Sequence, residues 1–214
     1  MLNPTASFVG EGGSGVSTFF SLDRTRQAPQ GLAGHHYFGF ALSHGVRDGT
    51  DLWFYHTRVL GRYEDEHLQM TGFMVKQKIG PKSAGGILLQ IGSQRGYGLF
   101  LGRRFPLLGG NGEKSSDRLQ LHLGLMWANW KGEWSGEEWV PYAGISHEID
   151  RRLRLTIEIR ERQKDFLKPT WLLAAHYQLN ARWLLVTGLH QSGLSDRAYP
   201  FLAIGSGVGI FGTR

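Results

Sequence analysis

The segment Arg152–Arg162, with the sequence RLRLTIEIRER, alternates strictly between polar and apolar residues up to Ile159. Only a β-strand, in which successive side chains point to opposite faces, separates such a sequence into one apolar and one charged face. Its length of about ten residues also suits a tilted strand that crosses a bilayer. We therefore predict a strand whose apolar face meets either lipid or the core of a soluble barrel. That face carries Leu153, Leu155, Ile157 and Ile159.

The same alternation recurs along the chain. In the segment 118–127 leucines occupy the odd positions from 119 to 125 and Trp127 the last one, while Gln120, His122 and Gly124 occupy even positions. Turn residues such as glycine and asparagine separate the alternating segments, as expected between strands. We predict an all-β fold of about 12 strands and no helix. The predicted strands cover 16–24, 36–44, 51–59, 68–76, 87–93, 97–105, 118–127, 139–147, 152–162, 171–178, 182–190 and 201–211.

Length and composition favour one barrel over several small domains. The chain has 214 residues, and we expect an N-terminal segment, 1–15, that leads into a single barrel domain, 16–214. A hydrophobic content of 41% fits a transmembrane barrel, because half of its spanning residues face a polar lumen. No apolar run approaches the ~18 residues that a membrane-spanning helix needs. The absence of cysteine excludes disulfides and thiolate metal sites.

Loop lengths provide a second indication of a membrane barrel. In the C-terminal half the connections 129–138, 163–169 and 191–200 are long, and they alternate with the short connections 148–151 and 179–181. Outer-membrane barrels have long loops outside and short turns at the periplasm, with an even number of strands. Two connections in the middle of the chain depart from this pattern. Residues 94–96 are short where a long loop is expected, and 106–117 are long where a short turn is expected.

Tryptophans cluster near the ends of the predicted strands. We expect Trp127, Trp139 and Trp171 to lie near the long loops, and Trp53 and Trp183 to lie near the opposite ends of their strands. Aromatic residues at both ends of the spanning strands are typical of the two membrane interfaces. These five residues are therefore predicted to be interfacial aromatics.

The C-terminal third resembles the closing hairpins of small bacterial outer-membrane β-barrel proteins. The resemblance rests on Tyr142-Ala143-Gly144, on the turn Leu179-Asn180-Ala181-Arg182, and on the glycine-alternating segment 201–211. Such proteins usually end on an aromatic residue, whereas here Phe211 is followed by Gly212-Thr213-Arg214. The resemblance implies a closed antiparallel transmembrane β-barrel in the bacterial outer membrane. It also implies contact with outer-membrane lipid, and we expect the numbering to be that of a mature form without a signal peptide.

A barrel with its apolar face toward lipid would have a charged lumen. Basic groups in a water-filled lumen favour anions, and the chain carries a formal net charge of +6. We therefore predict a channel or binding barrel for small anionic solutes. An ion-paired, filled lumen is the alternative, and would suit a structural barrel that works with other envelope proteins. The predicted lumen residues are Arg118, His122, Arg152, Arg154, Glu158, Arg160, Arg162 and His176, with Arg58 as a further candidate.

Two more alternatives remain open from the sequence. His190 and Ser192 resemble the histidine and serine, two residues apart, of lipid-A-deacylating barrels, although Gly193 stands where an asparagine usually follows. A soluble ligand-binding barrel is the other alternative. We expect no enzyme activity, no cofactor and no nucleic-acid partner. We also expect no metal site, because the histidines at 35, 36, 44, 56 and 67 have no ligand spacing.

Overall fold

The structure is a computed structural model, and it describes residues 11–22, 36–60, 67–107, 118–132, 136–161, 169–191 and 198–207. Within these ranges every regular element is a β-strand, and no helix able to span a membrane occurs in them. The strands are β1 (Ser14–Leu22), β2 (His36–Arg47), β3 (Thr50–Leu60), β4 (His67–Gly80), β5 (Ser83–Gly92), β6 (Gln94–Pro106), β7 (Leu119–Gly132), β8 (Gly136–Glu148), β9 (Leu153–Arg160), β10 (Thr170–Gln178), β11 (Trp183–Gln191) and β12 (Tyr199–Gly207).

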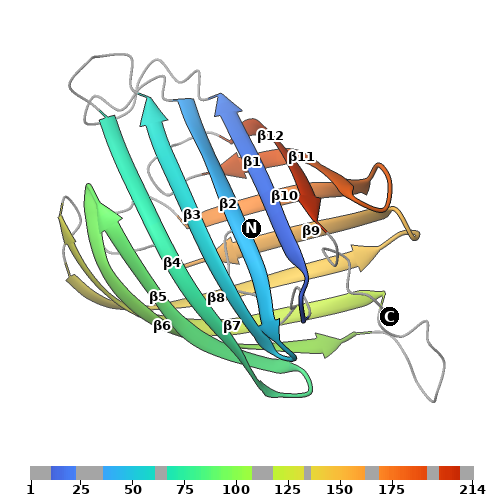
Figure 1. The fold of residues 1–214 in the computed structure, drawn as a ribbon, viewed down its shortest axis with the longest axis horizontal. Helices are drawn as coiled ribbons and strands as arrows, with labels where there is room; N and C mark the ends of the chain where they lie inside the picture. The colour runs from blue at the N-terminus through green and yellow to red at the C-terminus, as the bar shows by residue number, and fades with distance from the viewer. Residues whose placement is uncertain are drawn as a thin grey trace.

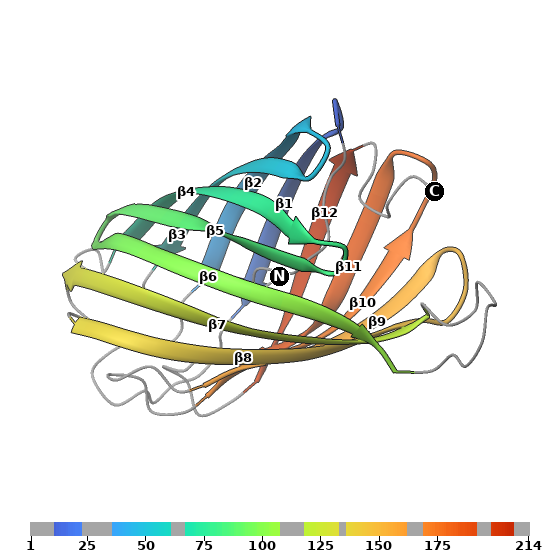
Figure 2. The same ribbon diagram turned by 90° about the horizontal axis from the view of Figure 1, so that it is seen from below.

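The strands form one closed barrel in which each strand pairs with its neighbours along the chain (Figures 1 and 2). Pairing of β1 with β12 closes the sheet, and all pairs are antiparallel. The predicted fold is thereby confirmed. Strand ends differ by a few residues; for example, β4 continues to Gly80 because Lys78 still pairs with Ala84 of β5. Closure leaves no strand edge unpaired, which is the condition for a sheet to exist in lipid.

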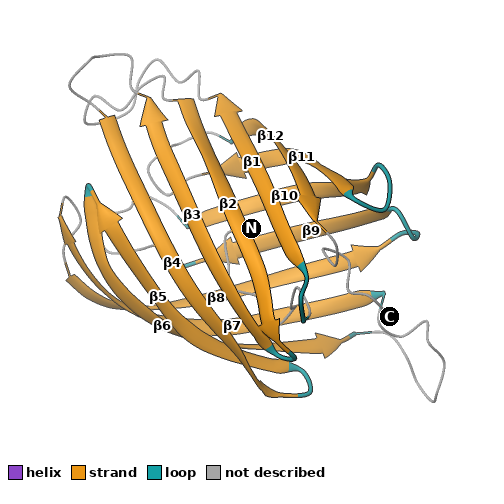
Figure 3. Cartoon of the chain, in the orientation of Figure 1, coloured by secondary structure: helices purple, strands orange, loops and turns teal. Residues whose placement is uncertain are grey.

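The barrel has two different ends (Figure 3). One end, here called the short-turn end, carries the β2–β3, β4–β5, β8–β9 and β10–β11 turns together with the start of β1 and the end of β12. The opposite end is the long-loop end, and most of its connections lie outside the described residues. The two predicted exceptions are present: Ser93 alone joins β5 to β6 at the long-loop end, and 107–118 joins β6 to β7 at the short-turn end.

The outer face of the barrel is apolar. On β9, Leu155, Ile157 and Ile159 point outward and are 40%, 55% and 47% exposed, whereas Thr156 and Glu158 point inward and are buried. Outward leucines and isoleucines continue this belt over β5–β7 and β10–β12. The soluble alternative required these residues to form an interior core, so it is wrong. An apolar exterior around a polar interior is the arrangement of a lipid-embedded barrel.

Aromatic rings on the inner face lie against glycines of neighbouring strands. The ring of Tyr142 covers Gly124, where a Cβ atom would come within 2.0 Å of the ring carbon Cζ. Tyr55 covers Gly72 in the same way, and its hydroxyl donates to Gln90 Oε1 at 2.7 Å. Because glycine has no side chain, each ring lies along the barrel wall instead of projecting toward the axis.

The predicted N-terminal segment, 1–15, lies mostly outside the described residues, and its last two residues already belong to β1. Pairing begins slightly earlier, since Gly12 N donates to Gly45 O at 2.8 Å. Likewise, the last four residues of the predicted strand 201–211 lie outside the described part of the chain.

Candidate functional site

The loop-end half of the inner wall on β6–β8 is filled by an apolar cluster. Its members are 0–7% exposed, and Met74 and Leu88 pack against them. Side chains packed this closely leave no room for water, so this part of the wall is not available to a passing solute. The apolar cluster consists of Phe100, Met126, Ala128, Trp130, Val140 and Tyr142.

Polar groups line the inner wall of the same strands at the short-turn end. Alternation along β6–β10 points these side chains inward, and strand register sets them side by side. Arg104 pairs with His122, Glu148 with Arg154, and Arg154 with His176. We call this group the vestibule cluster; its members are Arg104, His122, Ser146, Glu148, Arg154 and His176.

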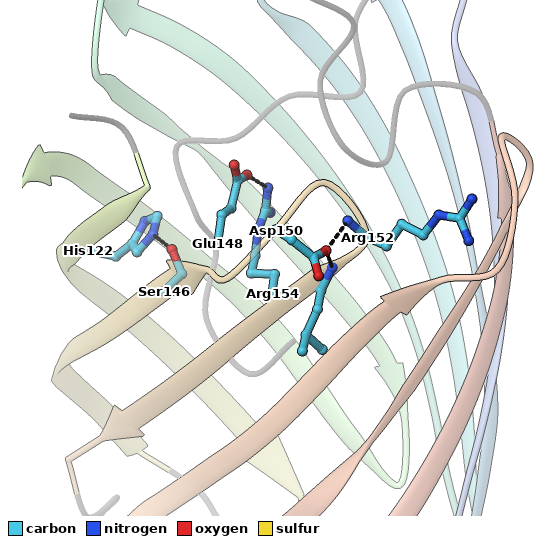
Figure 4. A network of polar contacts seen from close by, with 7 residues as sticks. His122, Ser146, Glu148, Asp150, Arg152 and Arg154 are labelled. Atoms are coloured by element: carbon cyan, nitrogen blue, oxygen red, sulfur yellow. Dashed lines mark hydrogen bonds and ion pairs between the residues drawn. The ribbon is translucent and has the colours of Figure 1, made fainter. Parts of the chain in front are cut away.

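The vestibule cluster is held by two direct contacts (Figure 4). Arg154 donates a short hydrogen bond to Glu148, and the two side chains are 27% and 38% exposed, respectively. His122 Nε2 and Ser146 Oγ are 3.0 Å apart. Arg104 and Arg154 both lie close enough to His122 to interact with it electrostatically. The cluster therefore combines two guanidinium groups with a single carboxylate, an arrangement with net positive charge that attracts anions.

Further along the lumen, Arg160 ends β9 on the inner wall, where it pairs with Tyr142 of β8 and Thr170 of β10. It interacts electrostatically with Glu158 and Glu138, and also with Tyr55 and Tyr142. Tyr55 belongs to β3, which lies on the far side of the barrel from β9 in the strand order. Arg160 therefore lies close enough to the opposite wall to interact electrostatically with it.

An ion pair lines the lumen on β3 and β4. Lys76 Nζ lies 3.4 Å from Asp51 Oδ2, and both side chains are almost completely buried. The same ammonium lies 5.4 Å from the centre of the Trp53 ring. Trp53 pairs with Ser43 and Met74 on the inner face, so it faces the lumen. Its predicted position at the lipid interface does not agree with the structure.

Five of the predicted lumen residues lie on the inner face: His122, Arg154, Glu158, Arg160 and His176. Arg118 is exposed just before β7, and Arg152 is exposed in the β8–β9 turn, so both lie on the rim of the short-turn end. Arg58 points outward, because it pairs with Phe38 on the outer face. Arg162 lies outside the described residues.

The charged residues of the inner face that were not predicted include Asp51, Lys76, Arg104, Glu138 and Glu148. Arg104 could have been found, since it shares the even-numbered face of β6 with Phe100 and Gly102. Glu148 was assigned to a turn, but it ends β8 and still pairs with Arg154.

Four of the five predicted interfacial aromatics point outward. Trp127 pairs with Trp139 near the long-loop end, where Trp139 is 66% exposed. Trp171 Nε1 donates a short hydrogen bond to Gln191 Oε1 at the same end. Trp183 lies at the short-turn end beside β10, which carries the exposed Tyr177. Their contact with the membrane interface stays a prediction.

Only one of the two hydrolase candidates lies in the described part of the chain. His190 lies on the inner face and meets Tyr199 edge to face, with ring centres 5.2 Å apart. Ser192 lies outside the described residues, so the pair has no geometry to test. No group of three or more potential metal ligands occurs in the described part of the chain.

Comparison with known proteins identifies relatives by fold and not by sequence. No protein family and no curated protein matches the chain. Among solved structures, the chain is similar to the KdgM porin, with a TM-score of 0.66 and 12% identity over 90% of this chain and 98% of the other. A second KdgM structure, in complex with disordered oligogalacturonate, matches equally well. The COG4313 outer membrane channel from Pseudomonas putida F1 matches with a TM-score of 0.55 and 10% identity over 97% of this chain and 99% of the other.

Proposed function

We propose that this barrel is a channel of the bacterial outer membrane that passes small anionic solutes through the charged side of its lumen. The observation that carries the proposal is the vestibule cluster, in which Arg104 and Arg154 face the lumen and Glu148 supplies the carboxylate. The next inward carboxylate, Glu158, lies over Gly144, which pairs with His122. Rings of basic side chains in a pore raise the local concentration of anions and repel cations. The solute would then pass the inward-facing Arg160 of β9.

The comparisons support the proposal by analogy of fold. Two of the similar structures are a porin and an outer membrane channel, and each is matched over nearly its whole length. The KdgM porin has been solved with oligogalacturonate, which is an anion. A shared fold alone does not show that two proteins have the same substrate. The charge of the vestibule cluster is therefore the argument specific to this chain.

Reversal potentials in planar bilayers under a KCl gradient test the proposal. We expect the barrel to open steadily and to prefer chloride over potassium. The double variant Arg104→Gln/Arg154→Gln should reduce the anion-to-cation permeability ratio several-fold, because both guanidinium charges of the vestibule cluster are removed. The control Arg95→Gln/Lys131→Gln removes two charges from exposed outward positions at the other end, and should keep the ratio. A cation-selective wild type, or equal loss in both variants, would contradict the proposal.

A structural barrel with a filled lumen is the second candidate. The apolar cluster and the buried Asp51–Lys76 pair support it, because both occupy lumen space without offering a binding group. The same recordings separate the two candidates. A correctly folded barrel that inserts into the bilayer and stays electrically silent would favour the structural role.

A further inference from the structure

Two turns at the short-turn end have the same construction. In the β8–β9 turn, Asp150 Oδ1 accepts the N–H groups of Arg152 and Leu153 at 2.6 and 2.9 Å. In the β10–β11 turn, Asn180 Oδ1 accepts those of Arg182 and Trp183 at 2.9 and 3.0 Å. Both are side-chain-capped turns in which the short polar residue replaces a backbone acceptor. Each turn therefore presents one arginine at the same position, two residues after its cap.

The two turns lie side by side on the rim. Gln178, the last residue of β10, donates from its N–H to Arg152 O at 2.8 Å, which joins the first turn to the hairpin that carries the second. The turns are two strand spacings apart, or roughly 10 Å. Arginine side chains are long enough to reach a shared group across such a gap. Figure 4 shows Arg152 extending along the rim, away from the Glu148–Arg154 pair.

Arg152 and Arg182 are both exposed, and neither side chain forms a salt bridge within 4 Å among the described residues, although Arg152 interacts electrostatically with Asp150. Directly below them on the outer face, Tyr177 and Trp183 are 41% and 44% exposed. Tyrosine and tryptophan at this position supply polar O–H and N–H groups at the level of lipid headgroups. We call these four residues the arginine–aromatic rim.

The apolar belt continues without interruption from the arginine–aromatic rim. Leu155 on β9 and Leu173 on β10 point outward and are exposed, so they would meet acyl chains. A group with a negatively charged head and an apolar tail fits this surface, since arginine binds phosphate oxygens through two parallel hydrogen bonds. Short turns of outer-membrane barrels face the periplasm, where the adjacent leaflet consists of phospholipid.

We propose that the arginine–aromatic rim binds the headgroup of an anionic phospholipid. The phosphate lies between the guanidinium groups of Arg152 and Arg182, and the Tyr177 hydroxyl and Trp183 indole N–H contact the ester region. The acyl chains lie on the apolar belt. This site is separate from the lumen, so it does not depend on the proposed transport function.

Native mass spectrometry of the full chain in detergent, with phosphatidylglycerol or phosphatidylcholine added, tests the proposal. We expect the wild type to retain phosphatidylglycerol several-fold more than phosphatidylcholine. The variant Arg152→Gln/Arg182→Gln should lose that preference. Arg152→Lys/Arg182→Lys keeps both charges but not the paired hydrogen bonds. This variant should retain an amount of phosphatidylglycerol between those of the wild type and the glutamine variant. A heat-dependent gel shift establishes that each variant is folded.

The matched control is Lys82→Gln/Arg103→Gln. It removes two exposed charges from the same end, where Ser83 pairs with Arg103, but from a site with neither capped turn and no tyrosine or tryptophan. This control should bind phosphatidylglycerol as the wild type does. Unchanged binding in the Arg152→Gln/Arg182→Gln variant, or equal loss in the control, would overturn the proposal. Displacement of the lipid by millimolar inorganic phosphate would also overturn it, by showing a site for free anions.

Discussion

The two halves of β7 and β8 differ on the inside although they are alike on the outside. Toward the long-loop end their inner faces carry Met126, Ala128 and Val140, all nearly inaccessible to solvent. Toward the short-turn end the same faces carry His122 and Ser146, which are joined by a hydrogen bond. Leucine, isoleucine and tryptophan cover the outside of both halves.

The difference shows which constraint acts on each surface. Lipid demands an apolar residue at outward positions along the whole spanning length, so the outer face varies little. The inner face does not meet lipid, so no single environment restricts which residues it carries along its length. One half can therefore be packed like the core of a soluble protein and hold the barrel in shape, while the other half carries the polar groups that the proposed solute would meet.

The largest effect is expected from placing a charge in the packed half. Ala128→Asp puts a carboxylate where the side chain is 0% exposed and surrounded by the apolar cluster. An unpaired buried charge destabilises a fold by several kcal/mol. We expect the barrel to lose its heat-dependent gel shift. Gln120→Asp, on the same face of β7 in the polar half, should keep it; similar loss in both variants would remove the distinction between the halves.

A smaller effect is expected from truncation within the packed half. Met126→Ala leaves a cavity in the apolar cluster, and such changes typically destabilise by ~2–5 kcal/mol. His122→Ala, four residues away on the same face, removes a hydrogen bond to Ser146. Urea unfolding in vesicles should show a clearly lower midpoint for Met126→Ala than for His122→Ala. Ion selectivity, in contrast, should be unchanged in Met126→Ala.

The boundary between the halves can be tested at Gly124. A methyl group there would come within 2.0–2.4 Å of two ring carbons and the hydroxyl oxygen of Tyr142, so the ring must leave the wall. Overpacking of this kind costs about 1–3 kcal/mol. We expect Gly124→Ala to lower both stability and single-channel conductance, because the displaced ring enters the lumen. Gly98→Ala, whose nearest contact would be 3.2 Å, is the control and should change conductance little.

The smallest effect concerns the rim of the polar half and depends on pH. The backbone N–H groups of Arg152 and Leu153 hold the pKa of Asp150 below its ordinary value of 3.8. The turn is therefore stabilised by the ionised carboxylate above that value, and the stabilisation is lost as the pH falls through the lowered pKa. Asn180, the equivalent cap of the neighbouring turn, does not titrate.

Amide hydrogen exchange between pH 5 and pH 2 measures this contrast, after correction for the intrinsic pH dependence of exchange. Protection of the Arg152 and Leu153 amides should fall on acidification, while protection of the Arg182 and Trp183 amides should not. Asp150→Asn should abolish the difference. If both turns lose protection together, the cause is general opening of the rim and not titration of Asp150.

Alternation alone was enough to predict the strands and which residues of β7 and β9 share the apolar face, while closure was implied by the resemblance to outer-membrane barrels. Alternation fails on β3, where both faces are mixed: Asp51 and Trp53 point inward, while Phe54 and Arg58 point outward. With an apolar and a charged residue on each side, the sequence does not indicate which face meets lipid. Trp53 was consequently placed at the interface and Arg58 was considered for the lumen.

The candidate site required information that alternation does not contain. Residues facing the lumen on one strand can be read from the sequence, as for Arg154 and His176, but their partners depend on register. Glu148 meets Arg154 only because the β8–β9 turn sets those two positions opposite each other. The interaction of Arg160 with Tyr55 depends on the diameter of the closed barrel, which no local pattern specifies.

Tyrosine rings lying on glycines also have a consequence for electrical noise. The ring of Tyr142 is only 5% exposed, packs in the apolar cluster and donates its hydroxyl to Leu101 O at 3.3 Å, so it is held against the wall. Fast rotamer changes belong to exposed side chains. A barrel whose wall is built in this way should show an open-state current with little added noise from these rings.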